Sequence, residues 1–167
     1  MTTPPAPVTP DLRSLLTDED LATLRSAYRA ADMIEKAHGA SVDTFPPAGA
    51  FANFLLDYFY EAGSGSTPAS AEPWTPAERE LVLLGLLSSR LMGRGLNLAL
   101  HVYWGLMVGL SVQRIADTLT LAGIYSGMQS FTGSLGVLKG TLLVLHGTAS
   151  IDPSTNAIVG LLITRFA

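Results

Sequence analysis

The second half of the chain contains helix-length segments that are too apolar to form a solvent-exposed surface. The segments "LVLLGLL" (residues 81–87) and "LNLALHVYWGLMVG" (residues 96–109) place apolar side chains on nearly every side of a helix. A helix of this kind must be buried by other helices, by a second subunit or by a membrane. Charged residues make up only 14% of the 167 residues, which leaves few groups to cover the surface of a monomer.

Capping residues divide the chain into segments of helical length. A Ser, Thr or Asp side chain caps the start of a helix, and a glycine often ends one. The expected N-caps are Thr17, Thr75, Ser111 and Asp152, and the expected terminating glycines are Gly39, Gly63, Gly109 and Gly127. No segment shows convincing strand alternation, although "TLLVL" taken alone is ambiguous. The sequence therefore predicts an all-α fold, a single-domain helical bundle of about seven helices.

Composition along the chain predicts four parts. Residues 1–16 form a flexible Pro-rich arm, and residues 17–63 form an N-terminal helical pair. Residues 64–75, which contain "SGSTPASAEP", form a linker. Residues 76–167 form the helical core, where most of the apolar residues lie.

Several classes of function are excluded or disfavoured by what the sequence lacks. There is no cysteine, so disulfides, thiolate metal sites and cysteine nucleophiles are excluded. A net charge of −4 without a basic cluster disfavours nucleic acid as a partner. The absence of HExxH or paired metal-ligand spacing predicts no metal and no cofactor.

The apolar runs also bear on where the protein resides. They fall short of the roughly 20 apolar residues that a membrane span needs. Asn97 and His101 interrupt the longest one. The N-terminus lacks a basic region followed by an apolar one, so we expect no signal peptide and a cytoplasmic location.

One stretch of the core carries an ordered set of features. An apolar helix led by an acidic residue precedes a helix with a histidine, and a capped helix ending in Tyr-x-Gly follows. These features are Arg79–Glu80, His101, Gly109–Leu110–Ser111, Ile115, Asp117 and Tyr125–Ser126–Gly127. In this order they resemble the carboxymuconolactone decarboxylase family, which includes the alkylhydroperoxidase D-like proteins. The resemblance covers residues 78–127 and implies an oligomeric helical fold with a pocket near His101.

The chain departs from the family pattern in ways that bear on function. The hydroperoxidase branch carries a CxxC motif, and Arg94 and Asn97 stand at those positions. Without thiols, disulfide-based peroxide chemistry cannot operate, so the protein is not a thiol peroxidase. The spacing from Glu80 to His101 is about two residues longer than is usual in the family, and Gln129 replaces a family proline.

His101 and Glu80 are the candidate catalytic residues. A histidine is the side chain best suited to move a proton at neutral pH, and a buried carboxylate can orient it. The alternative for His101 is a hydrogen-bonded structural histidine. The alternative for Glu80 is a residue that stabilises the start of its helix or pairs with Arg79 or Arg90.

Five further residues are candidates for binding a substrate. Arg90 and Arg94 are suited to hold a carboxylate bidentately, although such arginines are more often solvated or bridge subunits. Asn97 and Trp104 share a helix face with His101. The resemblance places Tyr125 near the pocket, whereas a packed tyrosine with a surface hydroxyl is the simpler interpretation.

Two functions from different classes fit these observations. The first is a cofactor-free lyase-type enzyme that performs acid/base chemistry, decarboxylation or isomerisation, on a small carboxylate or lactone. The second is a non-catalytic oligomeric helical binding or scaffold protein with the same fold. In both cases we expect a homo-oligomer, a dimer, trimer or hexamer, because the composition leaves surplus apolar surface.

Overall fold

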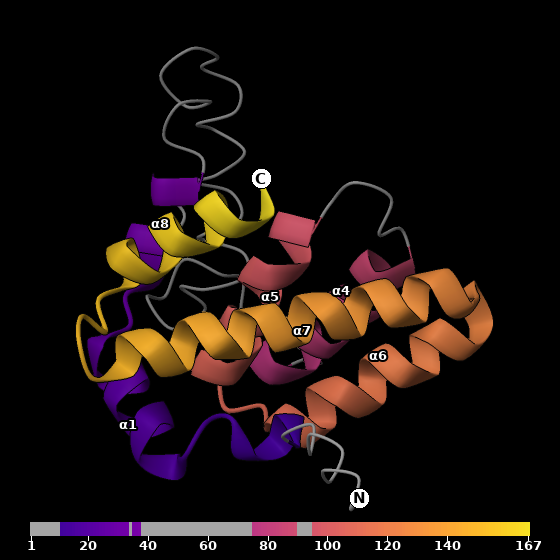
Figure 1. Ribbon diagram of the computed structural model, residues 1–167, viewed down its shortest axis with the longest axis horizontal. Helices are drawn as coiled ribbons and strands as arrows, with labels where there is room; N and C mark the ends of the chain where they lie inside the picture. Colours follow the sequence, from indigo (N-terminus) through magenta and orange to yellow (C-terminus); the bar gives the residue numbers. More distant parts are fainter. Residues whose placement is uncertain (1–10, 34, 38–74, 90–94) are drawn as a thin grey trace, which may run out of the picture.

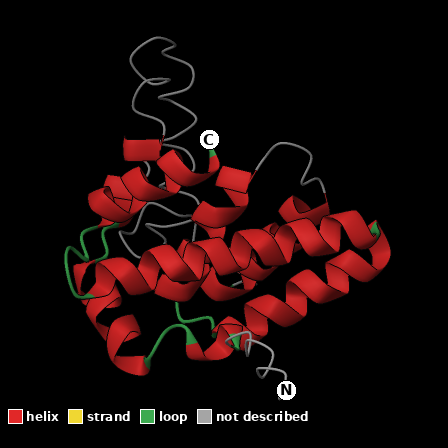
Figure 2. Ribbon diagram, in the orientation of Figure 1, coloured by secondary structure: helices red, strands yellow, loops and turns green. Residues whose placement is uncertain are grey.

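The computed structural model describes residues 11–33, 35–37, 75–89 and 95–167. Within these ranges every regular element is a helix, and no strand occurs (Figure 2). The all-α class is therefore confirmed. The helices are the 3-10 helix η1 (Leu12–Ser14) and the α-helices α1 (Asp18–Ala27), α4 (Pro76–Ser89), α5 (Gly95–Met107), α6 (Val112–Ser126), α7 (Met128–Ala149) and α8 (Thr155–Phe166).

Helix α5 lies at the centre of the core. It packs against α4, α7 and α8, and most of its side chains are buried, as its apolar sequence predicts. The long helix α7 runs across the molecule beside α6 (Figure 1). Helix α4 packs on α5 and α6, and α1 packs on α7 and α5. Helix α4, which carries Glu80, thus packs against α5, which carries His101.

Three of the four expected N-caps are confirmed. Thr17 caps α1, and its capping box is completed by Asp20. The backbone N–H of Glu78 donates to the Thr75 hydroxyl over 3.2 Å, and Ser111 caps α6.

Two glycines end helices where the sequence predicts it. Gly109 and Gly127 adopt φ values of 103° and 99°, which are unfavourable for residues with a side chain. The turn at Gly127 lets α7 follow α6 directly.

The first long helix is interrupted, contrary to the prediction of one continuous helix to Gly39. Helix α1 ends at Ala27, Tyr28 is extended with ψ 135°, and helical structure resumes at residue 30. The backbone N–H of Arg29 donates to the hydroxyl of Thr155 over 2.8 Å and so leaves the helix ladder. Gly39 lies outside the described residues, as does the helix expected to end at Gly63.

The start of the last helix also differs from its prediction. Ser154, and not Asp152, is the N-cap of α8, and its hydroxyl accepts from the N–H of Ala157. The Asp152 carboxylate instead accepts from the N–H of Ser154 over 3.1 Å. Asp152 therefore shapes the turn before the helix, and the serine two residues later caps it.

Small residues allow close helix contacts at two crossings. A Cβ atom on Gly123 would lie 2.7 Å from Cβ of Phe131, where α6 turns into α7. A Cβ atom on Gly140 would lie 2.7 Å from the ring of Phe166, where α7 meets α8. Both glycines are required for the packing of α7.

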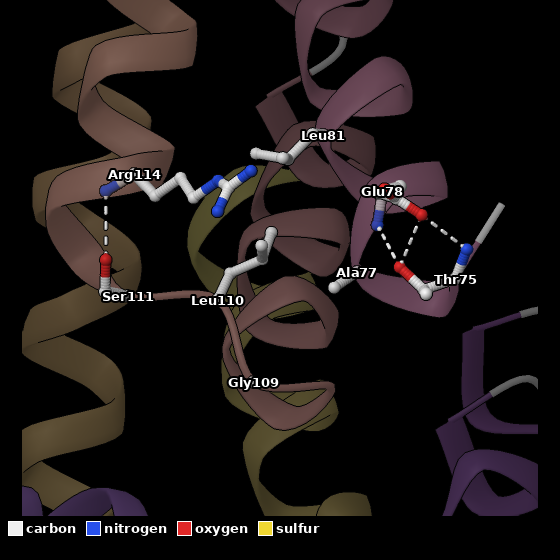
Figure 3. Close-up of a pocket in the computed structure, with 8 residues that line it drawn as sticks. All are labelled: Thr75, Ala77, Glu78, Leu81, Gly109, Leu110, Ser111 and Arg114. Carbon is white, nitrogen blue, oxygen red and sulfur yellow. Dashed lines mark hydrogen bonds between the residues drawn. The ribbon is translucent and has the colours of Figure 1, made fainter.

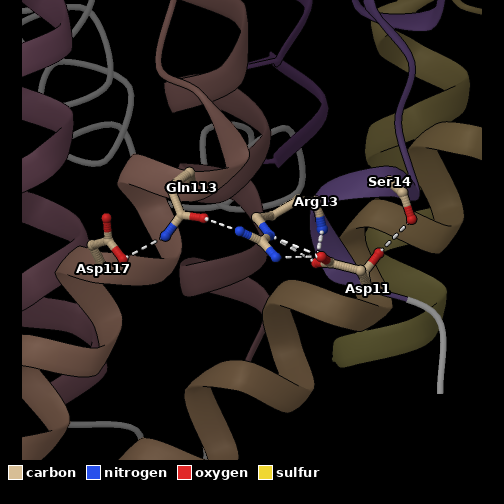
Figure 4. A network of polar contacts seen from close by, with 5 residues as sticks. All are labelled: Asp11, Arg13, Ser14, Gln113 and Asp117. Atoms are coloured by element: carbon tan, nitrogen blue, oxygen red, sulfur yellow. Dashed lines mark hydrogen bonds and ion pairs between the residues drawn. The ribbon is translucent and has the colours of Figure 1, made fainter.

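A polar network on the surface joins the N-terminal turn to α6 (Figure 4). The guanidinium of Arg13 donates to Asp11 and to the side-chain oxygen of Gln113. The amide nitrogen of Gln113 in turn donates to Asp117 over 2.6 Å. The bonds to Arg13 lower the pKa of Asp11 to about 2. All four side chains are exposed, so the network orients η1 and adds little to stability.

Among the described helices, none combines the length and the hydropathy that a membrane span requires.

Candidate functional site between helices α4 and α5

The two candidate catalytic residues form a hydrogen-bonded pair. Nδ1 of His101, on α5, lies 2.9 Å from Oε2 of Glu80, on α4. The Glu80 side chain is 1% exposed, and the His101 side chain is 22% exposed. The pair thus has a buried carboxylate at its inner end and an imidazole that reaches toward solvent at its outer end.

This geometry assigns separate tasks to the two ring nitrogens of His101. The carboxylate of Glu80 accepts a hydrogen bond from Nδ1–H and so selects that tautomer. Nε2 is then the ring nitrogen that can exchange a proton with a bound molecule. A positive charge formed on the ring would be stabilised by the carboxylate behind it.

Trp104 forms one side of the histidine site. It lies one helical turn after His101 on α5, and the two rings stack with centroids 6.0 Å apart and planes 23° apart. Trp104 is 5% exposed, and its indole nitrogen is fully buried. The stacked indole and the hydrogen bond to Glu80 together restrict the orientation of the imidazole.

Two tyrosines extend the cluster inward. The rings of Tyr28 and Tyr103 meet edge to face, with centroids 5.8 Å apart and planes 87° apart. Burial raises the pKa of Tyr28, and the neighbouring Tyr103 and the charge of Glu80 raise it further. Burial also raises the pKa of Tyr103 to about 12. Both phenols are therefore neutral at physiological pH.

Tyr28 is a residue of this cluster that the sequence pattern did not single out. Its spacing from Leu21, Leu24 and Ala31 assigns it to the apolar stripe of one helix. The structure instead places it at the break after α1, with its hydroxyl fully buried. No local signal marks that break, because the partner that creates it, Thr155, is distant in the sequence.

The remaining predicted binding residues are not brought into this cluster. Asn97 is exposed near the start of α5, and the Tyr125 side chain is 85% exposed at the end of α6. Arg90 and Arg94 lie outside the described residues. Of the predicted site residues in the described part of the chain, the structure thus brings together His101, Glu80 and Trp104.

A separate pocket of about 330 Å³ lies where α4 and α6 begin (Figure 3). Glu78 faces Thr75 there, and hydrogen bonds from Thr75 lower the pKa of that carboxyl, with a smaller contribution from Arg114. Thr75, Glu78 and Ser111 thus cap the starts of α4 and α6, and we assign no ligand to this pocket. The pocket is lined by Thr75, Ala77, Glu78, Leu81, Gly109, Leu110, Ser111 and Arg114.

Within the described ranges, no group of three or more His, Asp or Glu side chains is arranged to hold a metal ion. The groups of the α4–α5 cluster that are suited to move a proton are His101 and Glu80, which lie beside the ring of Trp104.

Comparison with known proteins adds no further identification. No protein-family model, no characterised protein and no solved structure matches this chain. The site is therefore interpreted from its own geometry.

Proposed function

We propose that the protein is a cofactor-free acid/base enzyme similar to carboxymuconolactone decarboxylase. It would decarboxylate or isomerise a small carboxylated or lactone-like substrate. The observation that carries this proposal is the 2.9 Å hydrogen bond between His101 and the buried carboxylate of Glu80. A buried carboxylate that orients a partly exposed imidazole is suited to general acid/base catalysis.

In the proposed decarboxylation, the bond between the substrate carboxylate and its neighbouring carbon breaks and carbon dioxide leaves. The electron pair passes into the adjacent conjugated carbonyl system. His101 enters this step as the imidazolium, with a proton on each ring nitrogen, and Glu80 stabilises that charge. Nε2–H then delivers its proton to carbon, and the ring becomes neutral with Nδ1–H still bonded to Glu80. In the proposed isomerisation, Nε2 removes a proton from one carbon and returns it to another.

Substrate recognition is assigned to the candidates that the sequence offers. Arg90 and Arg94 are the candidates to hold the substrate carboxylate, since a guanidinium binds a carboxylate through two hydrogen bonds. Trp104, which stacks on His101, would contact an apolar part of the substrate through the same site.

We also propose that the protein assembles as a homo-oligomer through the corner where α6 meets α7. Four large apolar side chains are exposed there, three of them at helical spacing on α6 and one at the start of α7. They are Leu121 (59%), Ile124 (71%), Tyr125 (85%) and Met128 (72%). Residues 118–138 contain no charged side chain, so two copies could approach without repulsion between like charges. An exposed apolar patch of this kind is typical of a protein interface.

The enzymatic proposal is tested with a panel of small mono- and dicarboxylic acids and lactones. A compound that raises the melting temperature is then assayed for loss of carbon dioxide or for isomerisation. We expect His101→Gln and Glu80→Gln to abolish turnover while the protein remains folded.

His146→Gln is the matched control, because His146 lies on α7, is exposed and contacts Asp20. Full turnover in His101→Gln would refute the assignment. Absence of any ligand in the panel, with all variants folded, would favour the non-catalytic alternative.

A further inference from the structure

Helix α1 buries little of its own surface. Of its ten residues only Leu24 is buried, whereas most of the residues of α5 are buried. Helix α1 packs on α7 and α5 at the periphery of the bundle (Figure 1). Elements with few buried apolar side chains can open locally while the rest of a fold stays intact. The polar contacts of α1 therefore decide how firmly it is held.

The C-terminal end of α1 is anchored to α5 and α8. Nε of Arg25 donates to the carbonyl oxygen of Leu106, in the last turn of α5, over 3.0 Å. Tyr28 then leaves the helix in an extended conformation, and the N–H of Arg29 donates to the Thr155 hydroxyl over 2.8 Å. An opening of α1 would thus turn about Tyr28 and break the contacts that precede it.

The N-terminal end of α1 is joined to α7 through a single carboxylate oxygen. Oδ2 of Asp20 accepts the backbone N–H of Thr17 over 3.0 Å and lies 3.3 Å from Nδ1 of His146. The oxygen that completes the capping box of α1 is therefore the same oxygen that contacts α7. The His146 side chain is 57% exposed, so it can exchange protons with solvent.

The charges around His146 leave Asp20 as its partner. Within the described ranges, Asp20 is the charged side chain that forms an ion pair with His146. Helix α5 carries no charged or titratable side chain besides Tyr103 and His101, whose imidazole is bonded to Glu80 of α4. The other charged side chains on α7 and on the helices packed against it are Asp18, Glu19, Arg25, Glu78, Arg79, Arg114, Asp117, Lys139 and Arg165, and in the described structure none of them forms an ion pair with His146.

We infer that α1 is a proton-sensitive strap, which opens as a unit about Tyr28 and is held against α7 by the charge on His146. An imidazole takes up a proton near neutral pH, and the ionised Asp20 carboxylate attracts the imidazolium more strongly than the neutral ring. Mild acidification therefore closes the strap while Asp20 stays ionised. Opening uncovers Leu24 and frees the Leu106 carbonyl. This inference does not depend on the enzymatic proposal.

The strap is tested by hydrogen exchange of the backbone amides of the full chain at about pH 6 and about pH 8, corrected for the intrinsic exchange rates. We expect the α1 amides to exchange faster than those of α7 at both pH values. We expect them to be about threefold better protected at the lower pH, the size of effect that an exposed ion pair supplies. Equal protection of α1 at the two pH values would overturn the inference.

His146→Gln keeps an N–H donor for the Asp20 carboxylate and cannot take up a proton. Its exposed position lets the variant fold, and the pH dependence of α1 protection should disappear. His101→Gln is the matched control, because that imidazole contacts α4, and it should keep the threefold ratio. A pH dependence that persists in His146→Gln, or α1 amides that exchange only as slowly as those of α7, would overturn the inference.

Discussion

The α4–α5 interface and the α6–α7 corner depart from ordinary protein architecture in opposite ways. At the first, the Glu80 carboxylate and the Tyr103 phenol lie inside the fold, where apolar side chains are usual, and the partly exposed imidazole of His101 contacts the carboxylate. At the second, large apolar side chains from Leu121 to Met128 lie on the surface, where polar ones are usual. Both regions are helical and lie in the same bundle.

The difference between the two regions indicates two kinds of role. A buried ionisable pair costs desolvation energy, and a fold that keeps it needs a compensating use such as chemistry or specificity. An exposed apolar patch costs solubility unless another surface covers it. The α4–α5 interface is thus the region on which the enzymatic proposal rests, and the α6–α7 corner is the region on which the assembly proposal rests.

Removal of the buried carboxylate is expected to have the largest effect. Glu80→Ala should lower the free energy of unfolding by about 3 kcal/mol, because it leaves an internal hole and removes the partner of His101. Glu78→Ala is the matched control on the same helix, where the carboxylate is exposed, and should cost clearly less. Urea unfolding of both variants measures the difference, and equal losses would contradict the view that Glu80 is a core residue.

The next largest effect is expected at a helix crossing of the α6–α7 corner. Gly123→Ala places Cβ 2.7 Å from Cβ of Phe131, and we expect it to lower the free energy of unfolding by about 2 kcal/mol. Gly136→Ala, on α7, meets nothing within 4 Å and should stabilise the helix by up to about 1 kcal/mol. Thermal unfolding distinguishes these opposite signs. A stable Gly123→Ala variant would mean that the corner is loosely packed.

A smaller, pH-dependent effect is expected at Asp20 on α1, whose carboxylate contacts the exposed His146 on α7. Hydrogen bonds from Thr17, with a smaller contribution from His146, lower the pKa of Asp20 below its ordinary 3.8. The pKa of Asp20 is lower in the folded chain than in the unfolded chain, so its ionised carboxylate stabilises the fold at a pH above the unfolded-state pKa. That stability is lost as the pH falls through the folded-state pKa.

Asp20→Asn should therefore lower the free energy of unfolding by about 1 kcal/mol in neutral buffer, because it removes the negative charge that completes the capping box of α1. The difference from the unmodified protein should disappear at a pH below the folded pKa of Asp20. Denaturant unfolding at both pH values tests this, and a difference independent of pH would exclude a role for the charge.

The smallest effect on unfolding is expected from the apolar face, where the change should appear in association. Ile124→Asp should convert the oligomer to monomers and alter the unfolding of the monomer by no more than about 0.5 kcal/mol. Ile151→Asp is a matched control, because Ile151 is 84% exposed beyond the far end of α7. Analytical ultracentrifugation reads the result, and a monomeric unmodified protein would refute the assembly proposal.

Local signals allowed the helix ends to be predicted, because capping depends on residues that are close in sequence. Helices α4 and α6 are capped by Thr75 and Ser111, and two helices end at Gly109 and Gly127, which adopt positive φ values. The pairing of Glu80 with His101 was one of two alternatives that the sequence left open for Glu80, and the structure shows their contact.

The features that sequence reasoning missed depend on distant partners or on competing signals. The break at Tyr28 is made by Thr155, and no helix propensity encodes such a contact. At α8, Asp152 and Ser154 are both good caps, and only the turn geometry decides between them. The exposure of Tyr125 depends on which face of α6 is covered, and a helical repeat alone does not determine that.

The hydrogen bond from Arg29 to Thr155 joins positions 126 residues apart. The entropic cost of closing a loop grows only slowly with its length, so a single hydrogen bond can join the segment after α1 to the start of α8 although most of the chain lies between them.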